Sequence, residues 1–561
     1  MRWSGRIPTL AAPLAALAAA CWAAGCAPRG TCRGEWCGTV VFAAIGRPTS
    51  LLPPVTDQAL DRDIFGQIFL KLADVGPSLN TEGDAGFVPQ LADRWTWVDS
   101  LTLAFHLNPN ARWQDGVSVT ARDVAFTFAA YADTALGSPF RADFAQIASV
   151  TAEGPGVVVF RFRTRSPEMF YDAVYHLWVL PAHLLDTVPL GRWGSAAFGR
   201  APVGDGPYRL ARWTSGESLE LDADSAFFLG RPHLRRLLWR FDGDLSVAVT
   251  QVIAGDADAL EVLVTPTNIA RARATPRLRL YRYPGSVYTM VGFNLRARRG
   301  GGPHPIFGDA AVRRALVLAT DRVAMAQSVF GDAAKVPPGP IPESWTALWS
   351  GGPAVPPYDT AAADRLLDSA GWKMGRDGIR RRLGRTLAFA LDVPATSPPR
   401  RQYAELIQEE LRRVGADVRI DVFDPPTLDE RLRSGRYDAA IESWDNDPAP
   451  SSGIPDAWLS DGGSNFGHYA DPTFDRWVHA ALRAPSPHDA VADWRAALGV
   501  LAHDAPAIML CANDNVAAIA RRIADVRLRS DDYWAYVRDW RIPPDQRIAR
   551  DRFVAPAAGT R

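Results

Sequence analysis

The chain has 561 residues, which is enough for about three domains of roughly 100–200 residues each. Its content of 47% hydrophobic and 22% charged residues is ordinary for a globular protein and excludes a disordered chain or a multi-span membrane protein. Lys plus Arg and Asp plus Glu both number 62, so net charge gives no argument for a nucleic-acid partner.

The first segment, residues 1–26, has the pattern of a signal peptide. Arg2 and Arg6 precede an apolar stretch that two prolines interrupt, which is typical of an export signal and not of a spanning helix. The segment ends in "AAGC", which resembles a bacterial lipoprotein cleavage site with Cys26 as the lipidated residue. Cys21 is a poorer alternative, and a plain secretory peptide is another. All three interpretations predict export.

The cysteines that follow include a pair for which an oxidising compartment would permit a disulfide. Residues 27–38 form a short polar tether in which Cys32 and Cys37, in "CRGEWC", are close enough for a small disulfide loop. No second ligand pair follows them, so the spacing is a poor zinc signature. Cys511 lies in the apolar run "APAIMLC" and is predicted to be a buried small hydrophobe.

The next segments give clear signals of secondary structure. "TVVFAAIG" (39–46) predicts a strand, and "LTLAFHL" (101–107) alternates apolar and polar residues as a half-buried strand does. "TARDVAFTFAAY" (120–131) predicts a helix, because Thr120 and Asp123 have the spacing of a capping box before an apolar stripe.

The middle of the chain continues this mixture of strands and helices. "PVGDGPYRLARWTSGESLELDAD" (202–224) predicts a rigid turn followed by two strands around a Ser-Gly turn. "FGDAAVRRALVLATDR" (307–322) predicts a helix that Asp309 caps. A βαβ unit is predicted over 386–423, with its helix at 401–415.

A strand that runs into an acidic loop comes next, in "YDAAIESWDNDPAP" (437–450). Trp444, Asp445 and Asp447 stand where the strand gives way to prolines, with no basic residue beside them. Two such carboxylates commonly cap a loop and face water. Because Trp444 and the strand precede them, we interpret them instead as part of a cleft wall.

Signatures of catalysis and of metal binding are absent from the sequence. It contains no G-x-S-x-G, no H-E-x-x-H and no phosphate-binding loop. Asp445, Asp447 and Asp456 do not make an EF-hand. In a loop that starts at Asp445, the fifth position would be Ala449, and Pro450 stands where a glycine is required. Two carboxylates two residues apart rarely straddle a glycoside. We therefore expect no catalytic residue, metal ligand or cofactor.

Taken in order, these segments strongly resemble the family 5 extracellular solute-binding proteins, the dipeptide- and oligopeptide-binding group of ABC importers. The resemblance covers roughly residues 40–540 and includes "PVGDGPYRL", "VRRALVLATDR" and "YDAAIESWDNDP". The chain departs from the family pattern at Asp205 and at Pro448. The residues that carry the main signature are Pro89, Leu91, Ala92, Trp95, Asp115, Gly116, Thr120, Ala121, Asp123 and Val124.

The resemblance implies an α/β fold of the two-lobed periplasmic-binding-protein type, class II and like dipeptide-binding proteins, with an additional domain on the first lobe. Ligand would lie between lobes that close around it. The expected limits are 39–60, 198–275 and 500–550 for lobe one, 61–197 for the additional domain, and 276–499 for lobe two.

The function that the resemblance implies is capture of peptides outside the cytoplasm and delivery to an ABC permease with its ATPase subunits. The protein would be a monomer, lipid-anchored at the periplasmic or cell-surface side of a membrane, and not an enzyme. In peptide-binding members an aspartate shortly after the strand's tryptophan pairs with the ligand's α-ammonium, which here is Asp447, with Trp444 and Asp445 beside it.

Several alternatives stay open at this point. The same fold could bind nickel, haem or another non-peptide solute, or act as a peptide-binding sensor or chaperone. An extracytoplasmic hydrolase is a rival from a different class, although the sequence offers no nucleophile–base pair for it.

Overall fold

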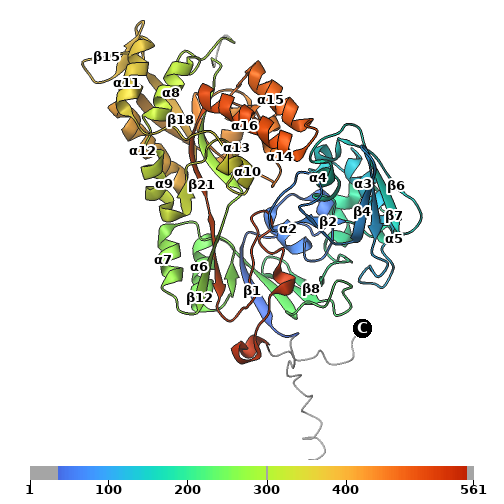
Figure 1. The fold of residues 1–561 in the computed structure, drawn as a ribbon. Helices are drawn as coiled ribbons and strands as arrows, with labels where there is room; N and C mark the ends of the chain where they lie inside the picture. Colours follow the sequence, from blue (N-terminus) through green and yellow to red (C-terminus); the bar gives the residue numbers. More distant parts are fainter. Residues whose placement is uncertain (1–35, 298–300, 552–561) are drawn as a thin grey trace, which may run out of the picture.

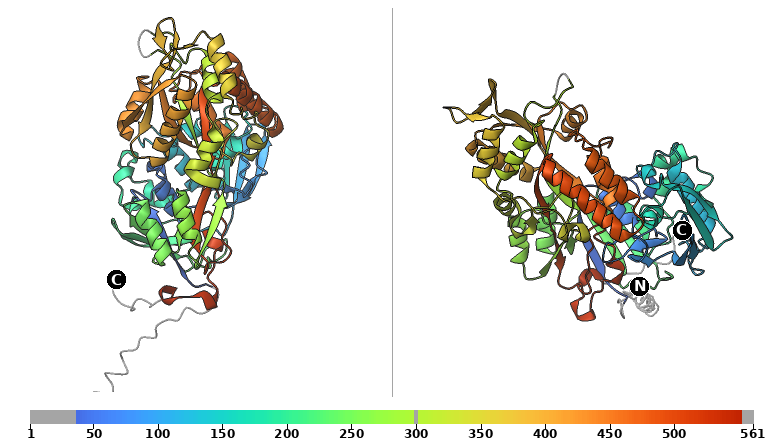
Figure 2. Two further views of the ribbon diagram at one scale, coloured as in Figure 1. Left: turned by 90° about the vertical axis from the view of Figure 1, so that its left-hand side faces the viewer. Right: turned by 45° about the horizontal axis from the view of Figure 1, so that its top comes forward.

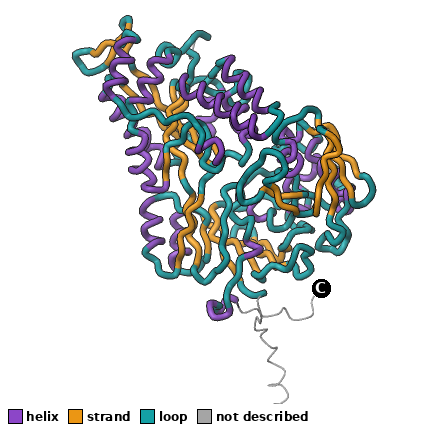
Figure 3. Tube along the Cα trace, in the orientation of Figure 1, coloured by secondary structure: helices purple, strands orange, loops and turns teal. Residues whose placement is uncertain are grey.

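The computed structural model describes residues 36–297 and 301–551, which form two lobes and an additional domain (Figure 1). Each lobe is built on one open sheet. Strands lie inside each lobe and helices lie on the outside (Figure 3). The structure is therefore α/β, as the sequence predicts.

The sheet of lobe one is formed by segments from three distant parts of the chain. β1 confirms the strand predicted at 39–46, and it pairs in parallel with β10 and β11. Its side chains are buried on both faces, because α6 (Leu245–Ala254) and α7 (Pro266–Arg273) cover one face and the main core the other. In spatial order the strands are β12 (Leu278–Tyr283), β22 (Asn515–Ala520), β11 (Ala259–Leu260), β1 (Thr39–Ile45), β10 (Arg236–Asp242), β9 (Ser218–Ala223) and β8 (Tyr208–Thr214).

The sheet of lobe two contains the predicted βαβ unit. β18 and β19 are parallel neighbours, and α12 (Pro398–Arg413) connects them. This helix starts earlier than predicted because prolines stand at its first positions, where their fixed φ suits a helix. In spatial order the strands are β14 (Ala334–Lys335), β21 (Ala507–Asn513), β13 (Val287–Phe293), β20 (Ala439–Asp445), β18 (Ala388–Pro394) and β19 (Asp417–Phe423).

Helices cover both sides of the lobe-two sheet. The predicted helix at 307–322 is α8, and the Asp309 carboxylate accepts a hydrogen bond from the Ala311 N–H at 2.9 Å. A small three-stranded sheet lies at the edge of the lobe, formed by β15 (Lys373–Met374), β16 (Arg380–Arg382) and β17 (Arg385–Thr386). The helices are α8 (Ala310–Leu318), α9 (Arg322–Phe330), α10 (Thr346–Ser350), α11 (Thr360–Ser369), α13 (Pro425–Arg433), α14 (Pro450–Trp458), α15 (Pro472–Leu482) and α16 (Pro487–Asp504).

Two short crossings connect the lobes. The chain passes from β12 to β13 through residues 284–286, and it returns from β21 to β22 through Asp514. The limits expected from the sequence put these crossings near 276 and 500, whereas strand pairing puts β12 in the first sheet and β21 in the second. β12 (LRLYRY) carries two arginines and β21 (AIMLCAN) is largely apolar, but neither local pattern tells which sheet the strand joins. The other domain limits stay predictions.

The additional domain lies to one side of the two lobes (Figure 2). The strand predicted at 101–107 is one of its strands, and the predicted helix is α3 (Ala121–Ala132), with the capping box of Thr120 and Asp123 formed. β2 (Ala73–Val75) and β3 (Phe87–Pro89) pair beside it. Its four-stranded sheet has the order β4 (Ala92–Asp99), β5 (Thr102–Leu107), β7 (Val157–Phe162) and β6 (Ile147–Ala152).

The turn predicted at the start of 202–224 packs against residues 68–70 and so connects this domain with lobe one. A Cβ at Gly204 would lie 1.9 Å from the Ile68 carbonyl oxygen, so only glycine allows this close approach. The Leu70 N–H donates to the buried Asp205 carboxylate at 2.8 Å. The unusual aspartate therefore holds the segment that leads to Lys71.

The cysteine predictions have different outcomes. Cys511 is buried and free, which confirms the prediction for it. Cys37 is buried and disulfide-bonded, but Cys32 lies outside the described residues, so their pairing stays a prediction. Cys26 also lies outside them. Within 36–297 and 301–551, no helix combines the length and the apolar character needed to cross a membrane.

Candidate functional site

A cavity of about 300 Å³ lies where the two lobes and the additional domain meet. Its walls come from five separate parts of the chain. These are the short helix α2 (Ala59–Phe65), the additional domain, the crossing at Ser286, the end of β20 with the start of α14, and the segment 530–533. The lining residues that carry charge are Arg62, Asp63, Lys71, Asp445, Asp447, Asp456, Asp531 and Asp532, with His176 beside them.

β20 brings the three predicted residues to this cavity. Trp444 and Asp445 are its last residues, and they lie opposite Tyr288 and Val287 at the start of the antiparallel β13. The end of β20 is therefore next to the first crossing, and the Ser286 hydroxyl donates to the Asp445 carboxylate. The ends of strands at such crevices are preferred ligand sites in α/β folds.

Asp447 follows two residues later and lies against the additional domain. Its side chain is 29% exposed, and one carboxylate oxygen, Oδ2, lies 3.1 Å from His176 Nε2. The Trp345 indole N–H donates to the Asp447 backbone carbonyl at 2.9 Å, which fixes the loop. Burial raises the pKa of Asp447, but His176, Arg62 and Lys71 offset this and leave the pKa below its ordinary value. Asp447 is therefore an ionised acceptor at neutral pH.

The cavity carries more acid than base. Six aspartates line it, against the two permanent cations Arg62 and Lys71. Burial raises the pKa of Asp532 to about 6, and burial together with Asp532 and Glu261 raises the pKa of Asp63 well above its ordinary value. This lining favours a positively charged group in the cavity.

Lys71 is held in place by several partners. Its ammonium lies 3.2 Å from the Asp74 carboxylate, and 4.5 and 4.7 Å from the ring centroids of Tyr175 and Trp178. Asp74 also accepts a hydrogen bond from Arg529 at 2.8 Å. Lys71 is thus part of a buried ion network, and its charge is already neutralised by the protein.

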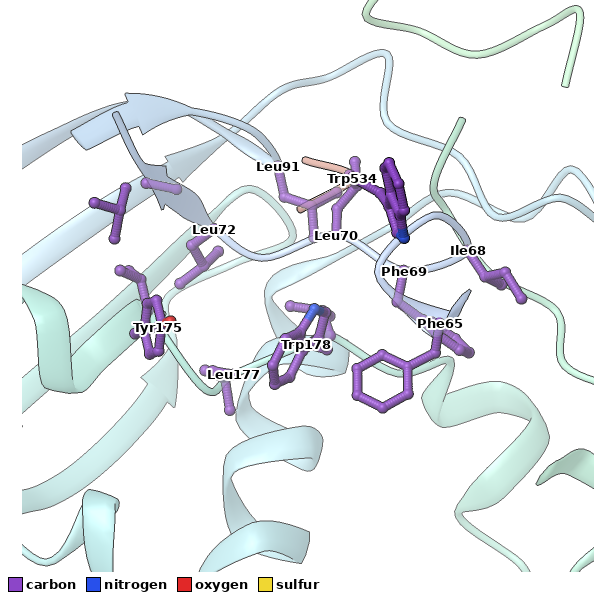
Figure 4. Packing of buried hydrophobic residues seen from close by; sticks show 14 of the residues in the cluster. Phe65, Ile68, Phe69, Leu70, Leu72, Leu91, Tyr175, Leu177, Trp178 and Trp534 are labelled. Atoms are coloured by element: carbon purple, nitrogen blue, oxygen red, sulfur yellow. The ribbon is translucent and has the colours of Figure 1, made fainter. Parts of the chain in front are cut away.

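The apolar core below the cavity keeps its aromatic wall rigid. Trp178 packs edge-on against Phe65, with ring centroids 5.0 Å apart, and Tyr175 lies nearby (Figure 4). Both Tyr175 and Trp178 are buried, and both line the cavity. On the opposite side Trp444 contributes a further ring. Such a wall is able to contact apolar parts of a ligand while the carboxylates orient it.

The structure thus brings Trp444, Asp445 and Asp447 to one cavity, and their role as ligand contacts stays a prediction. Sequence reasoning missed Arg62, His176 and Asp532. None of them belongs to a recognisable motif, and the acidic run "SDDY" at 530–533 is the one signal that could have pointed to a site. Among the described residues, no group of three or more His, Cys, Asp or Glu side chains is arranged to hold a metal ion.

Comparison with known proteins identifies the family to which the chain is similar. The model of the bacterial extracellular solute-binding proteins, family 5 (middle), matches residues 86–466. Protein XP55 of Streptomyces lividans is 27% identical over 539 residues, which is 93% of each chain. The oligopeptide-binding protein AppA of Bacillus subtilis is 25% identical over 415 residues, which is 72% of this chain and 73% of AppA.

Solved structures show the same fold. AppA of Bacillus subtilis, in complex with a nonapeptide, has a TM-score of 0.74 at 22% identity, covering 91% of this chain and all 100% of AppA. NikZ of Campylobacter jejuni, in complex with Ni(L-His), has a TM-score of 0.73 at 23% identity and covers 90% of this chain and 99% of NikZ. The expected two-lobed fold is thereby confirmed.

Proposed function

Because the chain belongs to the bacterial extracellular solute-binding proteins of family 5, we propose that it serves an ABC importer by capturing short peptides. The observation that carries this proposal is the interlobe cavity, in which the ionised Asp447 stands beside an aromatic wall and an excess of carboxylates. A peptide's α-ammonium is the cationic group that suits this arrangement.

Capture in this proposal follows from closure of the two lobes. Closing about residues 284–286 and Asp514 strips water from the ligand, and a buried ammonium without a partner is costly. Asp447 would supply that partner through its second carboxylate oxygen, Oδ1, since Oδ2 is bonded to His176. Trp444 and Asp445 would form the adjoining wall.

The cavity volume favours a short peptide. About 300 Å³ is at the lower end of the usual range for small-molecule sites, which is roughly 300–1,000 Å³. Main-chain groups of the ligand would then be held near both lobes, and side-chain selection would stay loose.

Partners and location extend the same proposal. Cys26 would carry a lipid that anchors the protein outside the cytoplasm, and the monomer would deliver its peptide to a membrane permease driven by ATPase subunits. Members of the family with other cargo, such as NikZ with its Ni(L-His), make a nickel chelate the second candidate ligand.

A thermal-shift panel tests the cargo class. A ligand at 100 times its dissociation constant that binds only the folded protein adds about 2.7 kcal/mol to stability. We expect di- to pentapeptides to raise the melting temperature, and sugars or single metal ions to leave it unchanged. A response to nickel with histidine, or to haem, and to no peptide would replace the peptide assignment. Native mass spectrometry of the purified protein would identify the ligand directly.

A further inference from the structure

Helix α2 presents one face to the core and the other to the cavity. Asp61, Ile64 and Phe65 are fully buried, and Asp61 accepts hydrogen bonds from the Thr49 and Thr56 hydroxyls at 2.6 and 2.7 Å. Residues three and four apart share a helix face, so Arg62 and Asp63 point the opposite way, into the cavity. The fold thus places the Arg62 guanidinium on the cavity wall without any local motif.

The Arg62 guanidinium makes no hydrogen bond and no ion pair within 4 Å to any of the residues that the structure describes. Burial lowers its pKa, but Asp447, Tyr175, Asp445 and Asp63 raise it more, so the pKa lies above its ordinary value. The side chain is half-buried and permanently charged. A guanidinium has five N–H donors, and buried donors are usually satisfied.

The other basic groups of the cavity already have acceptors. Lys71 is paired with Asp74, and His176 is bonded to Asp447. Arg529, just behind the wall, binds both Asp74 and Asp531, at 2.8 and 2.7 Å. Among the described residues lining the cavity, Arg62 is therefore the cation whose donors are open to a ligand.

A short peptide held in about 300 Å³ must have both of its charged ends neutralised within the same cavity. With its ammonium at Asp447, its carboxylate would face mainly other carboxylates unless a cation received it. We propose that Arg62 binds the C-terminal carboxylate of the peptide, in the bidentate geometry that guanidinium and carboxylate favour. This assignment rests on the proposed function.

The position of Arg62 also limits ligand length. Arg62 and Asp447 line the same cavity of about 300 Å³, so the two anchors share one small space. A dipeptide or tripeptide would reach from one to the other, whereas a longer chain would have to carry its carboxylate out of the cavity. Arg62 therefore selects short peptides with a free C-terminus.

Calorimetry on the full mature protein tests the assignment with Ala-Phe as the probe, in its free, N-acetylated and C-amidated forms. We expect wild type to bind the free dipeptide at least about 30-fold more tightly than its C-amide, as truncation of one member of a desolvated charge pair implies. Arg62→Gln should lose this preference, and Arg62→Lys should restore part of it. Arg94→Gln, at an arginine whose side chain is 65% exposed on β4, should behave as wild type.

The possible results separate this assignment from the proposed function. If the C-amide binds wild type as well as the free acid while N-acetylation still weakens binding, Arg62 is not the anchor and peptide capture stands. Retention of the acid preference in a folded Arg62→Gln protein would also overturn the assignment and point to Lys71. Absence of binding by any peptide to wild type would overturn both. Melting temperatures of all variants report whether each has folded.

Discussion

Asp447 already has a partner within the protein, because His176 Nε2 lies 3.1 Å from its Oδ2. The second oxygen, Oδ1, makes no side-chain hydrogen bond to the described residues and belongs to a carboxylate that is 29% exposed. An incoming ammonium would therefore share the carboxylate with His176 and would not have to displace it. His176 keeps the acid oriented, in the way that supporting hydrogen bonds pre-organise binding groups.

Replacement of this carboxylate by an amide isolates its charge. Asp447→Asn keeps the shape of the side chain, and we expect it to weaken peptide binding by about 2–5 kcal/mol, since it removes one side of a desolvated pair. Asp445→Asn should cost much less, because Asp445 is exposed and accepts the Ser286 hydroxyl. Calorimetry with free and N-acetylated peptide measures both. A larger loss in Asp445→Asn would refute the assignment of the ammonium to Asp447.

Helix α14 (Pro450–Trp458) begins shortly after Asp447 in the chain. Its first turn lies close to the carboxyl of Glu168, which belongs to the additional domain. Ser451 in that turn lies close enough to Glu168 to lower the pKa of its carboxyl, and Glu168 stands at the start of α4 (Met169–Val174) in the additional domain. Nearby, Arg165 donates to the Pro485 carbonyl in lobe two at 3.0 Å. The first turn of α14 in lobe two is therefore in contact with the additional domain.

Glu168 should make stability depend on pH. Burial raises its pKa to about 7 from an ordinary value of 4.5, although Ser451 lowers it in part. The folded protein thus binds the extra proton between pH 4.5 and 7, so stability contributed by this group falls as pH rises through that window. We expect the free energy of unfolding of wild type to fall by about 2 kcal/mol more than that of Glu168→Gln between pH 5 and 8.

Urea unfolding of the two proteins at both pH values provides the measurement. Glu405→Gln, at an exposed position on α12, is the matched control and should follow wild type. Parallel curves for wild type and Glu168→Gln would show that burial of this carboxyl does not contribute to the pH dependence.

On the scale of the whole molecule, the two lobes are joined by crossings of only a few residues, at 284–286 and at Asp514. Among the described residues, polar contacts between the additional domain and lobe two include His176 with Asp447, Glu168 with Ser451, and Arg165 with the Pro485 carbonyl. Short hinges are typical of proteins that open and close around a ligand.

Peptide binding should therefore favour the closed shape. We expect the radius of gyration from small-angle X-ray scattering to be larger without ligand and to fall when a saturating dipeptide is added. Asp447→Asn at the same peptide concentration should keep the larger value. An unchanged radius in wild type, at a concentration where calorimetry shows saturation, would contradict closure.

Membrane attachment through Cys26 is a separate proposal for the whole molecule. Cys26→Ser should yield a soluble or unprocessed protein, whereas the parent should partition into detergent, because two or more acyl chains anchor a protein stably. Detergent-phase partitioning followed by immunoblotting measures the difference. Equal partitioning of parent and variant would exclude lipidation at this cysteine.

Local signals in the sequence were sufficient for many elements. The alternation at 101–107, the capping box at Thr120 and the Asp309 cap each describe interactions between residues close in the chain, and each is formed in the structure. The same kind of local signal predicted where β20 ends. It therefore also predicted that Asp447 lies just after a strand. Such signals are readable because strand period and helix capping depend on neighbouring residues.

The composition of the cavity could be decided only by tertiary structure. His176 lies 271 residues from Asp447 along the chain, and the segment 530–533 reaches the cavity only because the chain crosses back between the lobes after β21. Nothing in the local sequence distinguishes Arg62 from other helix arginines. Its role becomes visible only in the structure, where Lys71 and His176 already have partners within the protein. The sequence alone therefore determined the family, the main elements and the place of Asp447 just after a strand. The pairing of charges between distant segments, which decides which of them stay open to a ligand, arose only when the lobes were packed together.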